Sequence, residues 1–78
     1  MTTTYVLTIS PEGEETIVHS VCRDVEFIKL IAEATHASSP LAESFAWPGW
    51  TDDGKGFFSA EIDNETWRIV PVPDVSRV

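Results

Sequence analysis

The spacing of the apolar residues changes twice along this chain, and this change most limits the folds that it can adopt. Apolar residues alternate over 4–10 and again over 57–72, as in half-buried strands, whereas between 25 and 35 they recur at helical spacing. Strands on both sides of a single helical segment predict an α+β fold, in which the helix covers one face of an antiparallel sheet.

The first alternating segment predicts a β-hairpin. Residues 4–10 and 16–23 supply its strands, and the turn at 11–15 contains a Pro that fixes φ and a Gly that accepts positive φ. We expect the register that keeps most apolar residues on one face. Its cross-strand pairs are Tyr5–Val21, Leu7–His19 and Ile9–Ile17.

The helix is expected over 25–35, with Asp24 as its N-cap and its end near His36. A broad apolar stripe should face the sheet; its members are Phe27, Ile28, Leu30, Ile31 and Ala34. Charged residues should face water on the other side, where Glu26 and Glu33 flank Lys29 at ion-pair spacing.

Residues 39–56 connect the helix to the second half of the chain. Ser39 and Pro40 can begin a second, short helical turn, because Pro is favoured at the first helical position. Pro48 and Gly49 are spaced for a type II turn, and we expect a flexible polar loop over 51–56.

A second hairpin is expected between strands at 57–63 and 66–72, with Asn64 and Glu65 as its two-residue turn. This register matches apolar with apolar and acid with base. Its pairs are Ile62–Trp67, Ala60–Ile69 and Glu61–Arg68. Because Pro71 and Pro73 cannot donate hydrogen bonds, the last strand should lie at an edge of the sheet or end there.

The predicted fold is therefore α+β in the order ββαββ. Two β-hairpins form a small antiparallel sheet, one main helix packs on one face, and a short second helix can follow it. A chain of 78 residues makes a single domain, 1–78, whose last residues, 74–78, should fray. The order of the strands in the sheet does not follow from the sequence.

The formal charge of −8, from 13 acidic and 5 basic residues, disfavours direct binding to nucleic acid or to anionic membranes and favours a protein partner with a basic surface. The acids fall into three groups at loops and hairpin ends: Glu12, Glu14 and Glu15; Asp52 and Asp53; and Glu61, Asp63 and Glu65. They can imitate phosphates, or simply keep the surface solvated. If the hairpins point the same way, the groups form one acidic end.

Trp47 and Trp50 flank the expected Pro-Gly turn. Two indoles on a turn can anchor a partner or stack on a sugar, or they can fold back and cap a small core. We expect one of them to be buried and the other to be partly exposed, and Trp67 to lie in the core.

No combination of side chains indicates catalysis, a metal or a cofactor. His19 and Cys22 are three residues apart on a strand, so they point to opposite faces and cannot share a zinc ion or form a nucleophile pair. The acids at 52–53 and 61–63 lack the spacing of an EF-hand loop. We therefore expect a protein that is not an enzyme.

The expected compartment is the cytoplasm, or the host cytoplasm if a virus encodes the protein. Cys22 is the single cysteine, so no internal disulfide can form. Residues 1–4 do not resemble the start of a secretory signal, and the apolar runs are too short to span a bilayer.

Three functions from different classes fit these features. The first is a small acidic inhibitor that occupies the basic, nucleic-acid-binding surface of a partner, and its narrow form is a phage-encoded nucleic-acid mimic such as an anti-CRISPR or anti-restriction protein. Its expected contact residues are Glu12, Glu14, Glu15, Trp47, Trp50, Asp52 and Asp53. The alternatives are a small-molecule or sugar-binding module at Trp47 and Trp50, and a self-associating structural subunit, such as a homodimer, that buries a sheet face or the edge of the last strand.

Overall fold

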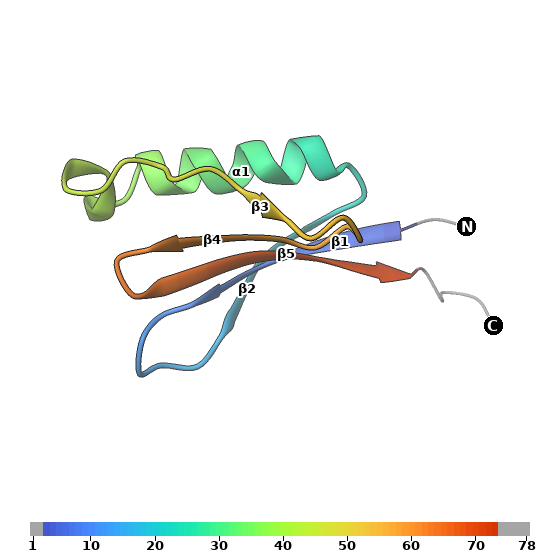
Figure 1. Ribbon diagram of the computed structural model, residues 1–78, viewed down its shortest axis with the longest axis horizontal. Helices are drawn as coiled ribbons and strands as arrows, with labels where there is room; N and C mark the ends of the chain where they lie inside the picture. The colour runs from blue at the N-terminus through green and yellow to red at the C-terminus, as the bar shows by residue number, and fades with distance from the viewer. Residues whose placement is uncertain (1–2, 74–78) are drawn as a thin grey trace.

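The computed structural model describes residues 3–73, which form a five-stranded antiparallel sheet with a helix along one face (Figure 1). The elements in chain order are β1 (Thr3–Ser10), β2 (Ile17–Cys22), α1 (Val25–Ala37), the 3₁₀ helix η1 (Pro40–Glu43), β3 (Thr51–Asp52), β4 (Phe58–Ile62) and β5 (Glu65–Pro73). The α+β class is confirmed, but the order ββαββ is incomplete because the expected polar loop contains β3. The expected fraying of 74–78 lies outside the described residues.

The strand order is β2-β1-β5-β4-β3, so β5 lies at the centre of the sheet. The expectation that the last strand is an edge strand is therefore wrong. Pairing between β4 and β5 ends at Ile69, whereas pairing between β1 and β5 continues to Pro73. Pro71 and Pro73 thus lie beyond the end of β4, where one side of β5 has no strand partner and a missing N–H is tolerated.

The first hairpin has the expected pair Ile9–Ile17, but a β-bulge between Leu7 and Thr8 shifts the rest of its register by one residue. Leu7 lies opposite Ser20, and Tyr5 lies opposite Cys22 rather than Val21. Because a one-residue shift moves every side chain to the other face, Cys22 packs against the core and Val21 is exposed.

The second hairpin turns at Asp63 and Asn64, whose φ angles are 51° and 62°. A tight turn with two positive φ angles favours Asp and Asn over Glu, so the expected turn at Asn64 and Glu65 is displaced by one residue. The register therefore shifts by two residues; the observed pairs are Ala60–Trp67, Glu61–Thr66 and Ile62–Glu65. A shift of two preserves the faces, and Trp67 is buried as expected.

Helix α1 begins where the sequence predicts. The Asp24 carboxylate accepts hydrogen bonds from the backbone N–H groups of Glu26, at 3.0 Å, and Phe27, at 3.3 Å. These bonds satisfy two of the donors that a helix start leaves without a partner. The short second helix is also confirmed, as η1 with Pro40 at its first position.

The buried face of α1 differs from the expected stripe. Ile28, Ala32 and His36 are buried, whereas Phe27 is 54% exposed and Leu30 is 60% exposed. Lys29 does not face water freely, since its Nζ lies 3.9 Å from the centre of the Phe58 ring and 3.6 Å from a carboxylate oxygen of Glu26. Ile31, a member of the expected stripe, is partly buried and packs against the same core, as do Trp47 and Trp50.

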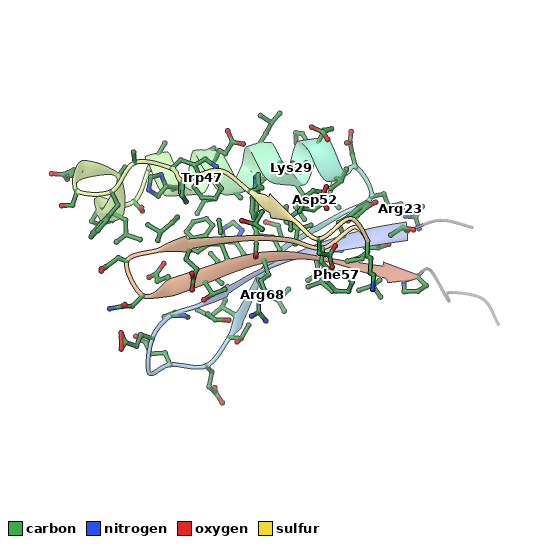
Figure 2. The ribbon with its side chains drawn as sticks, in the orientation of Figure 1. Arg23, Lys29, Trp47, Asp52, Phe57 and Arg68 are labelled. Carbon is green, nitrogen blue, oxygen red and sulfur yellow. The ribbon has the colours of Figure 1, made fainter. Side chains whose placement is uncertain are left out.

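The core lies between α1 and the sheet. Its buried apolar members are Leu7, Ile28, Ala32, Ala60, Ile62, Trp67 and Ile69. Figure 2 shows Lys29 and Trp47 on the helix side of the sheet, and Phe57 and Arg68 on the opposite side. That opposite side, called the open face below, has no helix over it among the described residues.

Candidate functional site

Acidic residues from two of the three groups meet at one end of the molecule. Ser10 pairs with Thr66, so the turn that follows β1 and the turn that precedes β5 lie side by side (Figure 1). Exposed carboxylates on these turns form what we call the acidic end: Glu12, Glu14, Glu15 and Asp63. None of them forms an ion pair within residues 3–73.

Asp52 and Asp53 lie away from the acidic end: Asp52 is the last residue of β3, and Asp53 begins the segment that joins β3 to β4. The Asp52 carboxylate accepts a hydrogen bond from the Gly54 N–H at 2.8 Å, and the Asp53 carboxylate accepts bonds from the N–H groups of Lys55 and Phe57, at 2.7 and 3.2 Å. These two acids therefore stabilise their own loop. The structure does not bring them together with Glu12, Glu14 and Glu15.

Trp47 and Trp50 are both half-buried and belong to an aromatic cluster over the core. The centre of the Trp47 ring lies 5.1 Å from that of Trp50, 5.5 Å from that of His36 and 5.7 Å from that of Trp67. The edge-to-face angles between these indoles are favourable for aromatic pairs. Both residues keep a partly exposed portion, so the expectation that one of the two would be buried is wrong.

The aromatic cluster contains two buried polar atoms without a hydrogen-bond partner in the part of the chain described: Nε2 of His36 and Nε1 of Trp50. Buried polar atoms usually have such a partner, and an unpaired one carries a free-energy cost. The helix side of the sheet is therefore well packed but not fully satisfied in its polar groups.

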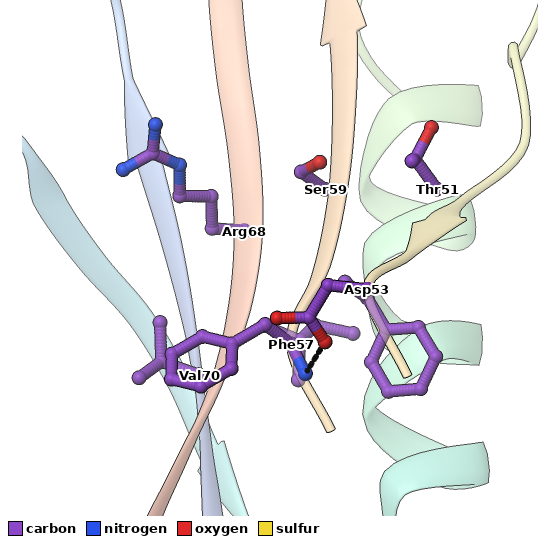
Figure 3. Close-up of a pocket in the computed structure, with 8 residues that line it drawn as sticks. Thr51, Asp53, Phe57, Ser59, Arg68 and Val70 are labelled. Atoms are coloured by element: carbon purple, nitrogen blue, oxygen red, sulfur yellow. Dashed lines mark hydrogen bonds between the residues drawn. The ribbon is translucent and has the colours of Figure 1, made fainter. Parts of the chain in front are cut away.

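The open face carries an apolar row that crosses four neighbouring segments. Val21 pairs with Val6, and Val6 pairs with Val70. Phe57, just before β4, lines the same pocket as Val70 (Figure 3). Val21 is 61% exposed and Phe57 is 45% exposed. We call these four residues the apolar row.

Sequence reasoning missed this surface. The signal was present, because the last strand has apolar residues at consecutive positions, which makes both of its faces apolar. The bulge that turns Val21 outward left no comparable signal.

Two adjoining pockets lie beside the apolar row, with volumes of about 380 and 250 Å³. Thr51, Ser59 and Arg68 line both of them, Phe57 lines the larger and Glu61 lines the smaller. Neither Arg68 nor Glu61 forms an ion pair within the described part of the chain. Both pockets open on the exposed face of the sheet.

The described residues contain no group of three or more His, Cys, Asp or Glu side chains placed to hold a metal ion. Among the same residues, no helix combines the length and the apolar character that crossing a membrane requires.

No protein-family model matches this chain, and no significant match was found among curated proteins or solved structures.

Proposed function

We propose that this protein is a small acidic inhibitor that binds another protein and occupies its basic, nucleic-acid-binding surface. The observation that carries the proposal is the meeting of two acidic turns, which places Glu12, Glu14, Glu15 and Asp63 at one end without neutralising partners in residues 3–73. A group of exposed carboxylates attracts a basic surface over several ångströms and speeds association with it.

The proposal assigns the protein no catalytic role, no cofactor and no direct contact with nucleic acid. Its narrow form is a phage-encoded mimic of nucleic acid, such as an anti-CRISPR or anti-restriction protein. In either form, the partner loses its nucleic acid because the acidic end takes the place of the phosphates. Asp52 and Asp53 contribute to the overall negative field of the protein, while their carboxylates also stabilise the loop before β4.

The test is retention of proteins from a bacterial lysate on the immobilised protein, at low and at moderate salt, after nuclease treatment. We expect a nucleic-acid-binding protein to be retained at low salt and released as salt screens the charges. The purified partner should then lose its labelled nucleic acid when this protein is added. Retention of no nucleic-acid-binding protein at either salt would contradict the proposal.

Two matched double variants distinguish an effect of the acidic end on partner binding from an effect of the net charge of the protein. Glu12→Lys with Glu14→Lys changes the acidic end, whereas Glu33→Lys with Glu43→Lys makes the same change in charge at exposed acids of α1 and η1. We expect the first pair to weaken partner binding by about tenfold or more and the second pair to have a much smaller effect. Equal losses would show that only the total charge matters.

The alternative, a small-molecule or sugar site at Trp47 and Trp50, makes a different prediction. A ligand that stacks on these indoles should change tryptophan fluorescence, with little dependence on salt. Because the two rings already contact each other and Trp47 contacts His36, such a ligand has only their exposed portions to bind.

A further inference from the structure

The open face has the composition of a surface that another molecule covers. The apolar row is continuous across β2, β1 and β5 through the direct pairs Val21–Val6 and Val6–Val70. Val18 and Val72 are also exposed, on the same side, since Val18 pairs with Thr8 and Val72 pairs with Thr4. Contiguous exposed apolar patches on small proteins commonly mark interaction sites.

Two residues of opposite charge, Arg68 and Glu61, lie next to the apolar row and do not form an ion pair with each other. Arg68 on β5 pairs in register with Ser59, and Glu61 on β4 pairs with Thr66, so the two charged residues are diagonal neighbours on adjacent strands. Both are exposed, and no ion pair joins them to each other or to any other described residue. The open face thus presents Arg68 and Glu61 beside the same apolar row, while the third charged residue there, Asp53, uses its carboxylate to accept from the backbone of its own loop.

We propose that a second copy of this chain covers the open face and forms a two-fold symmetric dimer of packed sheets. In a two-fold interface, if residue i contacts residue j, then j also contacts i. A face with one unpaired base and one unpaired acid is therefore complementary to itself: Arg68 of each copy pairs with Glu61 of the other. The apolar rows pack against each other, as in sandwiches of two sheets about 10 Å apart.

Charge complementarity favours a second copy over a different partner. A basic partner that matched the net charge of −8 would have to bury Arg68 against its own positive charges. A second copy supplies one acid for each base. The carboxylates of the acidic end lie on the turns that follow β1 and precede β5, and not on the paired strands that carry the apolar row.

The dimer and the proposed partner complex should respond to salt in opposite ways. Each copy carries a net charge of −8, so two copies repel each other, and screening by salt should strengthen the dimer. Screening weakens the attraction of the acidic end for a basic partner. The failure of one proposal is therefore distinguishable from the failure of the other.

The experiment is sedimentation velocity over a range of micromolar concentrations, at low and at moderate salt. We expect a monomer–dimer equilibrium for the unmodified chain, shifted toward dimer by salt. Arg68→Glu and Glu61→Arg should each weaken the dimer by about tenfold or more, because each places like charges in contact across the interface. The double variant Arg68→Glu with Glu61→Arg should restore most of the dimer, since the reciprocal pair is re-formed with its charges exchanged.

Two further variants locate the interface. Val21→Lys places a charge in the apolar row and should give a monomer, whereas Phe27→Lys places one on the exposed side of α1 and should leave the dimer intact. Circular dichroism checks that every variant is folded. A monomer at all concentrations, a charge exchange that fails to restore association, or a dimer that Phe27→Lys dissociates as strongly as Val21→Lys would each overturn the proposal.

Discussion

The two faces of the sheet carry similar apolar side chains in different surroundings. On β5, Ile69 is buried under α1, while the next residue, Val70, points to the open face. The same alternation places Leu7 in the core and Val6 in the apolar row. The comparison shows that β-branched and aliphatic residues define strands on both faces, but only a covering layer converts one face into a core.

The largest expected effect distinguishes the two faces at adjacent residues of β5. Ile69→Ala removes a fully buried side chain and should lower the free energy of unfolding by about 2–5 kcal/mol, enough to unfold much of a domain of this size. Val70→Ala, on the open face, should lower it by less than about 1 kcal/mol. Urea denaturation followed by tryptophan fluorescence measures both, and equal losses would contradict the assignment of the faces.

A smaller loss of stability is expected from a change at the start of α1, the helix that covers one face of the sheet. Asp24→Ala removes the carboxylate that accepts from the N–H groups of Glu26 and Phe27, and should cost about 1 kcal/mol. Glu33→Ala is the matched control, because Glu33 is an exposed acid within the same helix. Thermal unfolding should show a lower midpoint for the first variant only. An unchanged midpoint for Asp24→Ala would mean that the cap does not support the covered face.

The smallest expected effect is a gain in stability on the covered face. His36 is 4% exposed and its Nε2 has no hydrogen-bond partner among the described residues. His36→Phe keeps an aromatic ring beside Trp47 and Trp67 and removes the unpaired atom, so it should raise the free energy of unfolding by roughly 1 kcal/mol. The exposed His19→Phe should give no comparable gain. A loss of stability in His36→Phe would show that the imidazole is needed in the cluster.

Local sequence signals predicted the elements of this fold well. Asp24 caps a helix that begins at Val25, and Pro40 begins a 3₁₀ helix. Both signals act through backbone groups within a few residues of the side chain concerned, so they hold whatever surrounds the element. The expected burial of Trp67 also holds, because the register error of two residues in its hairpin kept its face.

The candidate site was less predictable, because it depends on which segments meet. The sequence indicated three acidic groups but not that the turn after β1 would lie beside the turn before β5, away from β3. It indicated the two indoles but not that their rings would contact His36 and Trp67. The strand order decides which segments lie side by side, and it depends on contacts between residues far apart in the chain.

By itself, the sequence determined the α+β class, the helix start, the presence of two hairpins but not their registers, and the strongly acidic composition. These follow from apolar spacing, caps, turn residues and charge, each of which is a property of a short segment. Only the tertiary structure decided that β5 occupies the centre of the sheet, that a bulge turns Val21 outward, and that α1 buries Ile28 rather than Phe27. These outcomes depend on which packing of the whole chain buries the most apolar surface with the fewest unpaired polar groups, and no single segment carries that information.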